Sequence, residues 1–252
     1  MGKNCDEFKS RLIGGQTIVG TFVKTPAPIV AEVLSLSDLD TFCVDVEHAP
    51  FGRLEVDLSV AAFRAADRPC IVRTANDSPT ELRNALDSGA SAVLIPHVTT
   101  AKQAQDIVKA AHFGEGGRGF AGSTRAAEFT TRRMPDHIAH SKQHTVVIVQ
   151  IEDLAALDNV TEIASVEGID AIFIGRVDLA VAMGKAPSDV EVIDTVRRIC
   201  KEASAAGTTV GMFTADLSEI PNWKSAGVSL FLLSSDQSLM LAGANELAKV
   251  AG

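Results

Sequence analysis

The stretch SPTELRNALDSGASAVLI, residues 78–95, contains one complete helix-to-strand unit. Ser78 precedes Pro79, and Glu81 lies three residues after Ser78, which is the pattern of a capped helix start. Gly89 predicts the helix end, because glycine readily adopts the left-handed conformation found just past a helix. The apolar run 92–95 that follows is typical of a parallel strand buried on both faces. This stretch therefore predicts a helix that leads directly into a buried parallel strand.

The same alternation runs through the whole chain. Between the apolar runs, Ala104, Ile107, Val108 and Ala111 follow a helical period. Alternating strands and helices predict either a closed barrel or an open doubly wound sheet. Eight units of even size favour the barrel, whose usual length is about 250 residues. We therefore expect one (β/α)8 barrel domain over residues 1–252, with strands within 18–23, 41–47, 69–75, 92–98, 145–152, 171–175, 209–214 and 230–235.

Composition narrows the class of protein. The chain is 46% hydrophobic and carries a formal net charge of −9. The first value excludes a disordered polymer, and the second argues against nucleic acid as the main partner. No apolar window reaches the length of a membrane helix, and the N-terminus lacks a secretory signal pattern. The cysteines, which we expect to be free and reduced in a cytoplasmic protein, show no C-x-x-C pair and are Cys5, Cys43, Cys70 and Cys200.

One segment breaks the alternation. Residues 114–133 are rich in Gly and Arg and begin with GEGGRG, which matches G-x-G-x-x-G. A dinucleotide fingerprint follows a strand and opens a helix, whereas this one follows a helix and leads into a loop, so we do not expect nucleotide binding. On the short polar helix near residues 134–142, His137 and His140 lack a metalloprotease pattern. We expect both, with His144 beside them, to be surface histidines.

Polar residues at the carboxyl ends of strands are the candidates for chemistry, because barrel active sites lie there. In the second run, alternation places Asp45 and Glu47 on one face and leaves His48 at the strand exit. Ionisable residues grouped at the end of an apolar strand favour a functional interpretation over a structural one. Arg73 ends the third run, where it could stabilise an oxyanion or form a surface ion pair.

The fifth and sixth runs end in carboxylates. Gln150 and Glu152 share a face, and Asp178 follows the next strand, so Glu152 and Asp178 are expected to meet at the rim. Two carboxylates suit Mg²⁺ or Mn²⁺, but they could also form an acid–base pair or be solvated loop residues. Lys24 ends the first run like a Schiff-base lysine, although a solvated lysine is the favoured interpretation.

An ordered set of motifs resembles the HpcH/HpaI family of metal-dependent class II pyruvate aldolases, which includes 4-hydroxy-2-oxoheptanedioate and 2-keto-3-deoxy-sugar-acid aldolases. It spans nearly the whole chain. The matching segments are DVEHAP at residues 45–50, LDSGA at 86–90, LIP at 94–96, RG at 118–119, QIE at 150–152, GIDAIFIG at 168–175 and DL at 178–179.

The resemblance implies a pyruvate-type (β/α)8 barrel that reversibly cleaves 4-hydroxy-2-oxo acids to pyruvate, or a related 2-oxo acid, and an aldehyde through an enolate held on the metal. It also implies a homohexamer of dimers that exchange C-terminal helices. In the implied site, Glu152 and Asp178 bind the divalent cation (Mg²⁺, Mn²⁺ or Co²⁺), and Arg73 contacts the enolate oxygen. His48 and Asp87 form a proton-transfer dyad. The implied substrate contacts come from Asp45, Gln150, Val177 and Asp178.

Two departures from the family pattern concern substrate specificity. Gly175-Arg176-Val177 replaces the usual Gly-Pro and small residue, and His112-Phe113-Gly114 replaces Tyr-Pro-Pro before a loop that is one residue short. Two alternative functions stay open. One is an acyl-CoA lyase of the citrate lyase β-subunit or malyl-CoA lyase type, and the other is a non-catalytic barrel that binds a keto acid.

Overall fold

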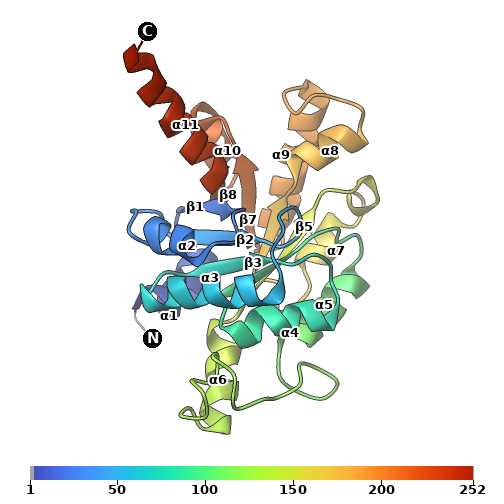
Figure 1. Ribbon diagram of the computed structural model, residues 1–252. Helices are drawn as coiled ribbons and strands as arrows, with labels where there is room; N and C mark the ends of the chain where they lie inside the picture. The colour runs from blue at the N-terminus through green and yellow to red at the C-terminus, as the bar shows by residue number, and fades with distance from the viewer. Residues whose placement is uncertain (1–2, 252) are drawn as a thin grey trace.

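The computed structural model describes residues 3–251 and forms a closed barrel of eight parallel strands (Figure 1). Each strand pairs with the next in the sequence, and the last pairs with the first. The predicted (β/α)8 barrel is therefore confirmed. The strands are β1 (Ile18–Val23), β2 (Thr41–Asp45), β3 (Cys70–Arg73), β4 (Ala92–Ile95), β5 (Val146–Ile151), β6 (Ala171–Ile174), β7 (Thr209–Thr214) and β8 (Val228–Ser235).

Helices follow the strands and surround the barrel. The start of α4 is as predicted, because the Ser78 side chain accepts a hydrogen bond from the Glu81 N–H, and Gly89 ends the helix with φ of 93°. The helices are α1 (Lys3–Ile13), α2 (Pro28–Ser35), α3 (Arg53–Ala65), α4 (Pro79–Ser88), α5 (Ala101–Ala111), α6 (Met134–His144), α7 (Val160–Ala164), α8 (Arg176–Ala182), α9 (Val190–Ala205), α10 (Ile220–Ser225) and α11 (Asp236–Ala248), with 3₁₀ turns η1 (Leu154–Ala156), η2 (Leu217–Glu219) and η3 (Lys249–Ala251).

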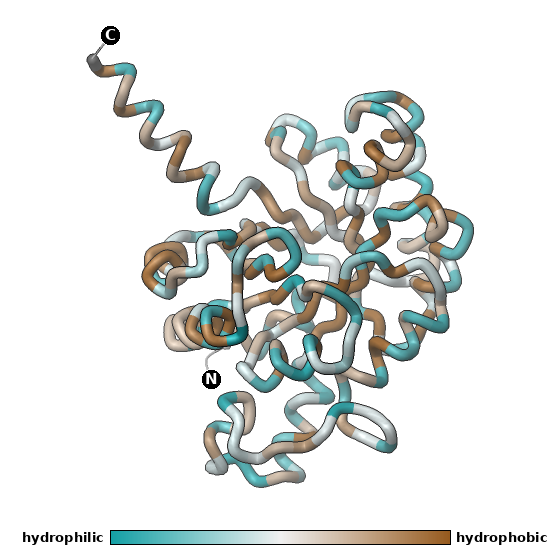
Figure 2. Tube along the Cα trace, turned by 45° about the vertical axis from the view of Figure 1, so that its right-hand side comes forward, coloured by the Kyte–Doolittle hydropathy of each residue, from teal (hydrophilic) through white to brown (hydrophobic). Residues whose placement is uncertain are grey.

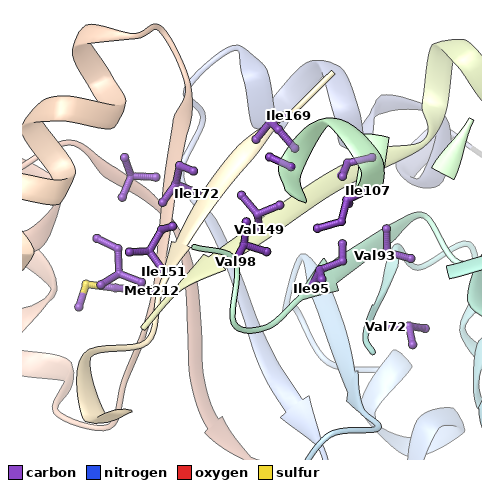
Figure 3. Packing of buried hydrophobic residues seen from close by; sticks show 14 of the residues in the cluster. Val72, Val93, Ile95, Val98, Ile107, Val149, Ile151, Ile169, Ile172 and Met212 are labelled. Carbon is purple, nitrogen blue, oxygen red and sulfur yellow. The ribbon is translucent and has the colours of Figure 1, made fainter. Parts of the chain in front are cut away.

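The larger core layer lies between the strands and the helices. Figure 3 shows Ile95 and Val149 on neighbouring strands, with Ile107 of α5 near them. These side chains are fully or almost fully buried. Strands covered in this way explain why the sequence runs are almost continuously apolar.

A second core layer fills the barrel interior. Cys43, Ile71, Ile148 and Phe173 project inward from four different strands. The layer is closed by Phe8 of α1, which is fully buried against these residues. Helix α1 thus covers the amino-terminal end of the barrel, an element that the sequence pattern did not predict.

The inward positions also determine where polar side chains gather. Because side chains alternate along a strand, the residue two places after each inward apolar residue points inward again. Two places after Cys43, Ile71 and Ile148 stand Asp45, Arg73 and Gln150, each at or near the carboxyl end of its strand. The barrel is therefore apolar below and polar at its mouth.

Helix α11 departs from the barrel wall. It projects away from the other helices, and hydrophobic and hydrophilic residues alternate along it (Figures 1 and 2). Of its described side chains only Asp236 is buried. Within residues 3–251, no helix is both long and apolar enough to cross a membrane.

The closure by α1 is testable through Phe8→Ala. Removing a fully buried aromatic ring should lower the free energy of unfolding by about 3–5 kcal/mol, measured by urea denaturation. Ile13→Ala, on an exposed position of the same helix, should change it by less than about 0.5 kcal/mol. Equal effects of the two substitutions would contradict a closing role for Phe8.

Candidate active site

An ion pair between neighbouring strands forms the base of the barrel mouth. Asp45 and Arg73 are direct register partners on β2 and β3. The Asp45 carboxylate accepts two hydrogen bonds from Arg73, from Nε at 3.0 Å and from Nη2 at 2.8 Å. Both side chains are buried, at 0% and 7% exposure. This two-bonded geometry fixes the guanidinium in one orientation.

The ion pair lowers the pKa of Asp45, and Arg73 makes two further contacts beside it. Burial raises the pKa of Asp45, but the hydrogen bonds and charge of Arg73 outweigh it, so the pKa lies below its usual value. Arg73 also contacts Glu47 Oε2 through Nη1 at 3.1 Å and lies over the Phe22 ring, 4.7 Å from its centroid. A guanidinium has five N–H groups. Two of them donate hydrogen bonds to Asp45, and Glu47 Oε2 accepts none, so the others are available to a substrate oxygen.

Glu152 is another buried carboxylate at the rim. It is 3% exposed, and burial raises its pKa despite hydrogen bonds from the Gln150 amide and the His97 backbone N–H. A side chain at Gly175 would lie 2.7 Å from Glu152 Oε2, so glycine is required where β6 ends. Glu152 is thus held close to the first turn of α8.

His97 is a site residue that sequence reasoning missed. Its Nε2 lies 3.4 Å from Glu47 Oε1, and its Nδ1 lies 3.4 Å from Glu152 Oε1 and 3.0 Å from Asp153 Oδ2. Burial lowers the pKa of His97, but the hydrogen bond of Asp153 and the nearby carboxylates outweigh it and the pKa is raised. His97 has a φ of 57°, which is strained for a residue other than glycine. The signal available in the sequence was a histidine just after the strand 92–95.

Two of the predicted site residues are not brought together. His48 is largely exposed at the mouth, with Nε2 3.5 Å from Glu47 Oε2. Asp87 instead pairs with Arg118 Nη2 at 3.1 Å. Burial raises the pKa of Asp87, and the charge of Arg118 opposes this increase. Among the described residues, the His48–Asp87 dyad is therefore not formed within one chain.

A pocket of about 390 Å³ opens above the Asp45–Arg73 pair. Arg73 and His48 line it, together with Val177 and Asp178 from the first turn of α8. Lys24 lines it as well, with Nζ 3.4 Å from Asp45 Oδ2, so this lysine is an ion-pair partner in the mouth and not a freely solvated group. The other lining residues are Phe22, Phe213, Ser234, Ser235 and Ser238.

Two donor sets for a divalent cation share Glu152. The set expected from the sequence adds Asp178, which is exposed beside the pocket. The other adds Glu47 and His97, whose potential ligand atoms all lie within 4.8 Å of one another and of Glu152. The rim combines several carboxylates, and the buried acceptor Gln150 Oε1 has no hydrogen-bond partner. This surplus of oxygen acceptors fits a hard divalent cation.

Arg176, one of the departures from the family pattern, does not enter the pocket. Its Nη1 lies 2.8 Å from Glu219 Oε2, and its guanidinium lies over the Trp223 ring at 5.6 Å. These partners belong to η2 and α10, which hold the side chain outside the mouth. We therefore do not assign Arg176 to substrate recognition.

The irregular segment 114–133 has a structural anchor. Arg118, inside the G-x-G-x-x-G match, is 6% exposed and lies over the Phe113 ring at 4.3 Å. The match is followed by turns and not by a helix, as expected for a segment without nucleotide binding. The prediction that His137 is a surface residue is wrong, because it is 2% exposed beneath Phe113 and Phe120.

Comparison with known proteins agrees with this arrangement. Residues 19–241 match the family described as HpcH/HpaI aldolase/citrate lyase. The chain belongs to this family. It is 33% identical over 246 residues to the 5-keto-4-deoxy-D-glucarate aldolase of Salmonella arizonae, covering 96% of this chain and 95% of that protein.

A second relative is the hydroxypyruvate/pyruvate aldolase of Roseovarius nubinhibens, 30% identical over 91% of this chain and 90% of that protein. Among solved structures, an HpcH/HpaI aldolase/citrate lyase family protein from Burkholderia cenocepacia has a TM-score of 0.92 at 31% identity, covering 98% of this chain and all of that one. Both named relatives are aldolases, which are carbon–carbon lyases. The predicted family and enzyme class are confirmed.

The raised pKa of Glu152 gives a prediction for the metal-free protein. The unfolded state ionises this carboxyl at about pH 4.3, whereas the folded state holds its proton to a higher pH. The free energy of unfolding therefore falls as the pH rises from about 4.3 through the raised pKa of the folded state. Glu152→Gln should therefore be more stable than the wild type at about pH 7 in EDTA, and the difference should vanish near pH 4. Urea denaturation at both pH values measures this. Glu162→Gln, at an exposed position of α7, controls for loss of a surface charge; an equal gain there would contradict the argument.

Proposed function

We propose that this protein is a divalent-metal-dependent aldolase that reversibly cleaves 4-hydroxy-2-oxo acids to pyruvate, or a related 2-oxo acid, and an aldehyde. The observation that carries the proposal is the buried Arg73, which is fixed by Asp45 and lines the same pocket as His48 and Asp178. The pocket thus presents an immobilised cation, a proton carrier and a carboxylate to one small substrate.

We assign the cation to Glu152 and Asp178, with Mg²⁺ or Mn²⁺ as the expected ion and Co²⁺ as a substitute. A bound divalent cation withdraws electron density from a 2-oxo group and makes its neighbouring C–H bonds more acidic. His97, which also contacts Glu47, then holds the Glu152 carboxylate in position from the outside of the mouth. Gln150 donates to the same carboxylate from within the barrel.

The remaining chemistry belongs to this chain's own side chains. The N–H groups of Arg73 that are not bonded to Asp45 would bind the oxygen that gains negative charge when the carbon–carbon bond breaks. His48, exposed at the pocket, would transfer the proton, directly or through water, because imidazole exchanges protons near neutral pH. The protein has no tyrosine that could replace it.

The aldehyde half of the substrate would occupy the part of the pocket lined by Lys24 and by Ser234, Ser235 and Ser238. An ammonium group and three hydroxyls favour an aldehyde that carries hydroxyl or carboxylate groups over an aliphatic one. Val177 and the backbone amides at the start of α8 would contact the keto-acid half. An acyl-CoA lyase is less favoured, because two relatives that are at least 30% identical to this chain are named aldolases.

Metal removal tests the function. Release of pyruvate from a 4-hydroxy-2-oxo acid should stop in EDTA and return with Mg²⁺ or Mn²⁺. Asp178→Asn should weaken cation binding at least about tenfold, as loss of a ligand or its support does, measured by calorimetric titration. The matched substitution His97→Gln should have a smaller effect. A larger effect of His97→Gln would move the cation to Glu47, His97 and Glu152.

The metal-dependent mechanism fails under a different result. If cleavage survives chelation and borohydride traps a covalent adduct on Lys24, the chemistry uses an imine and no metal. Lys24→Met, which keeps the length of the side chain, separates these cases. It should leave the cation requirement intact and change the preference among aldehydes.

We also propose a homohexamer in which α11 is exchanged between subunits, within a cytoplasmic protein. The apolar residues of α11 are exposed in the single chain, Leu241 by 63% and Leu247 by 76%. Leu241→Glu with Leu247→Glu should reduce the mass measured by light scattering after gel filtration, because burying two carboxylates in an interface is costly. Glu246→Gln on the same helix should leave the mass unchanged. A monomeric wild-type protein would contradict the proposal.

A further inference from the structure

A second cluster of metal-ligating side chains lies at the opposite end of the barrel from the mouth. Asp6 belongs to α1, and His140 and His144 lie one turn apart on α6. One potential ligand atom from each residue lies within 4.8 Å of the other two. Two histidines at i and i+4 of a helix present their rings on the same side, a spacing that suits one shared ion.

The contacts of His144 orient it as a ligand. Its Nδ1 lies 3.0 Å from the backbone carbonyl oxygen of Asp6, so an N–H at Nδ1 donates to that oxygen. The lone pair is then on Nε2. Histidines that bind metals commonly make this second hydrogen bond to a carbonyl, which fixes the tautomer and the ring orientation. The His140 ring lies beside it, with 4.3 Å between centroids.

Buried polar atoms without hydrogen-bond partners occur at the cluster of Asp6, His140 and His144. Asp6 Oδ1 is buried and has no hydrogen-bond partner, which is a costly state for a carboxylate. His140 and His144 line a cavity of about 40 Å³ together with His137. The buried ring of His137 has no partner on either nitrogen. The cavity is thus polar and large enough for an ion with a water molecule.

Three arginines lie at or near this cavity, and the first, Arg64, donates a hydrogen bond to the Gly89 carbonyl at 3.2 Å. Arg118 at the cavity wall is neutralised by Asp87 at 3.1 Å, and Arg132 is neutralised by Glu128 at 2.6 Å. Histidine binds metals as the neutral imidazole, so with the Asp6 carboxylate the three ligands carry a net charge of −1.

We propose that Asp6, His140 and His144 bind a second divalent cation, of the Zn²⁺ class, that joins α1 to α6. Two imidazole nitrogens, one carboxylate oxygen and a water molecule form a tetrahedral set that Zn²⁺ prefers over Mg²⁺. Bonds of about 2.0–2.1 Å place tetrahedral ligands about 3.3 Å apart, so the side chains need to move inward only slightly. Because α1 closes the barrel, the ion would stabilise that closure and take no part in catalysis.

The test uses the full chain, stripped of metal, and counts Zn²⁺ at both sites, because Zn²⁺ would displace Mg²⁺ from the mouth. Titration with Zn²⁺ against a chromophoric chelator should reveal one additional equivalent beyond the one at the mouth. His140→Ala and Asp6→Asn should each weaken this binding at least about tenfold. Asp6→Asn keeps the shape of the side chain, so it reports on the ligand even where His140→Ala perturbs folding.

Matched controls separate this site from the mouth. Glu152→Gln should keep the additional equivalent, whereas it removes the carboxylate shared by both donor sets at the mouth. In the Glu152→Gln background, Zn²⁺ should raise the melting temperature, and the further substitution His140→Ala or Asp6→Asn should remove that rise. Co²⁺ in the wild type should give the intense visible absorption of tetrahedral coordination. Unchanged Zn²⁺ binding in Asp6→Asn and His140→Ala, or its loss in Glu152→Gln alone, would overturn the proposal.

Discussion

The two hydrogen bonds between Asp45 and Arg73 are the constraint on which the mouth of this barrel depends. Both groups are charged and buried, and each is tolerable there only because of the other. Their positions as register partners on β2 and β3 place them side by side without any loop. Lys24 also contacts Asp45, and Glu47 also contacts Arg73. The Arg73 guanidinium is therefore a positive charge of fixed orientation, and the rest of the rim is arranged around it.

Glu152 has the opposite character. Burial raises the pKa of its carboxyl although His97 lies 3.4 Å away, and we expect the metal-free protein to be less stable for its presence. Strain of this kind is concentrated at functional sites, where a ligand relieves it. The contrast assigns different tasks to the two buried acids. Asp45 is satisfied within the protein, whereas Glu152 is available to an incoming cation.

Much of this was accessible from the sequence, because strand periodicity carries the information. The apolar runs placed the eight strands, and alternation put Asp45 with Glu47 and Gln150 with Glu152. Contacts from irregular segments were not accessible. His97 reaches the mouth through a left-handed backbone conformation that no periodic pattern encodes. Arg118, in the long segment 114–133, forms an ion pair with Asp87 in place of the predicted contact with His48. Helix α1 was not predicted because few apolar residues mark its period: of its described side chains, the buried ones are Cys5, Phe8 and Leu12.

Helix α11 links two properties that are usually treated separately. Its first turn supplies Ser238 to the pocket, and the Asp236 carboxylate accepts hydrogen bonds from the backbone N–H groups of Lys24 and Thr25. Its far end carries the exposed leucines. A substrate that orders the first turn therefore acts on the same rigid element that would hold a neighbouring subunit. If assembly of the subunits changes the affinity for substrate by some factor, thermodynamic linkage requires that substrate change the affinity between subunits by the same factor.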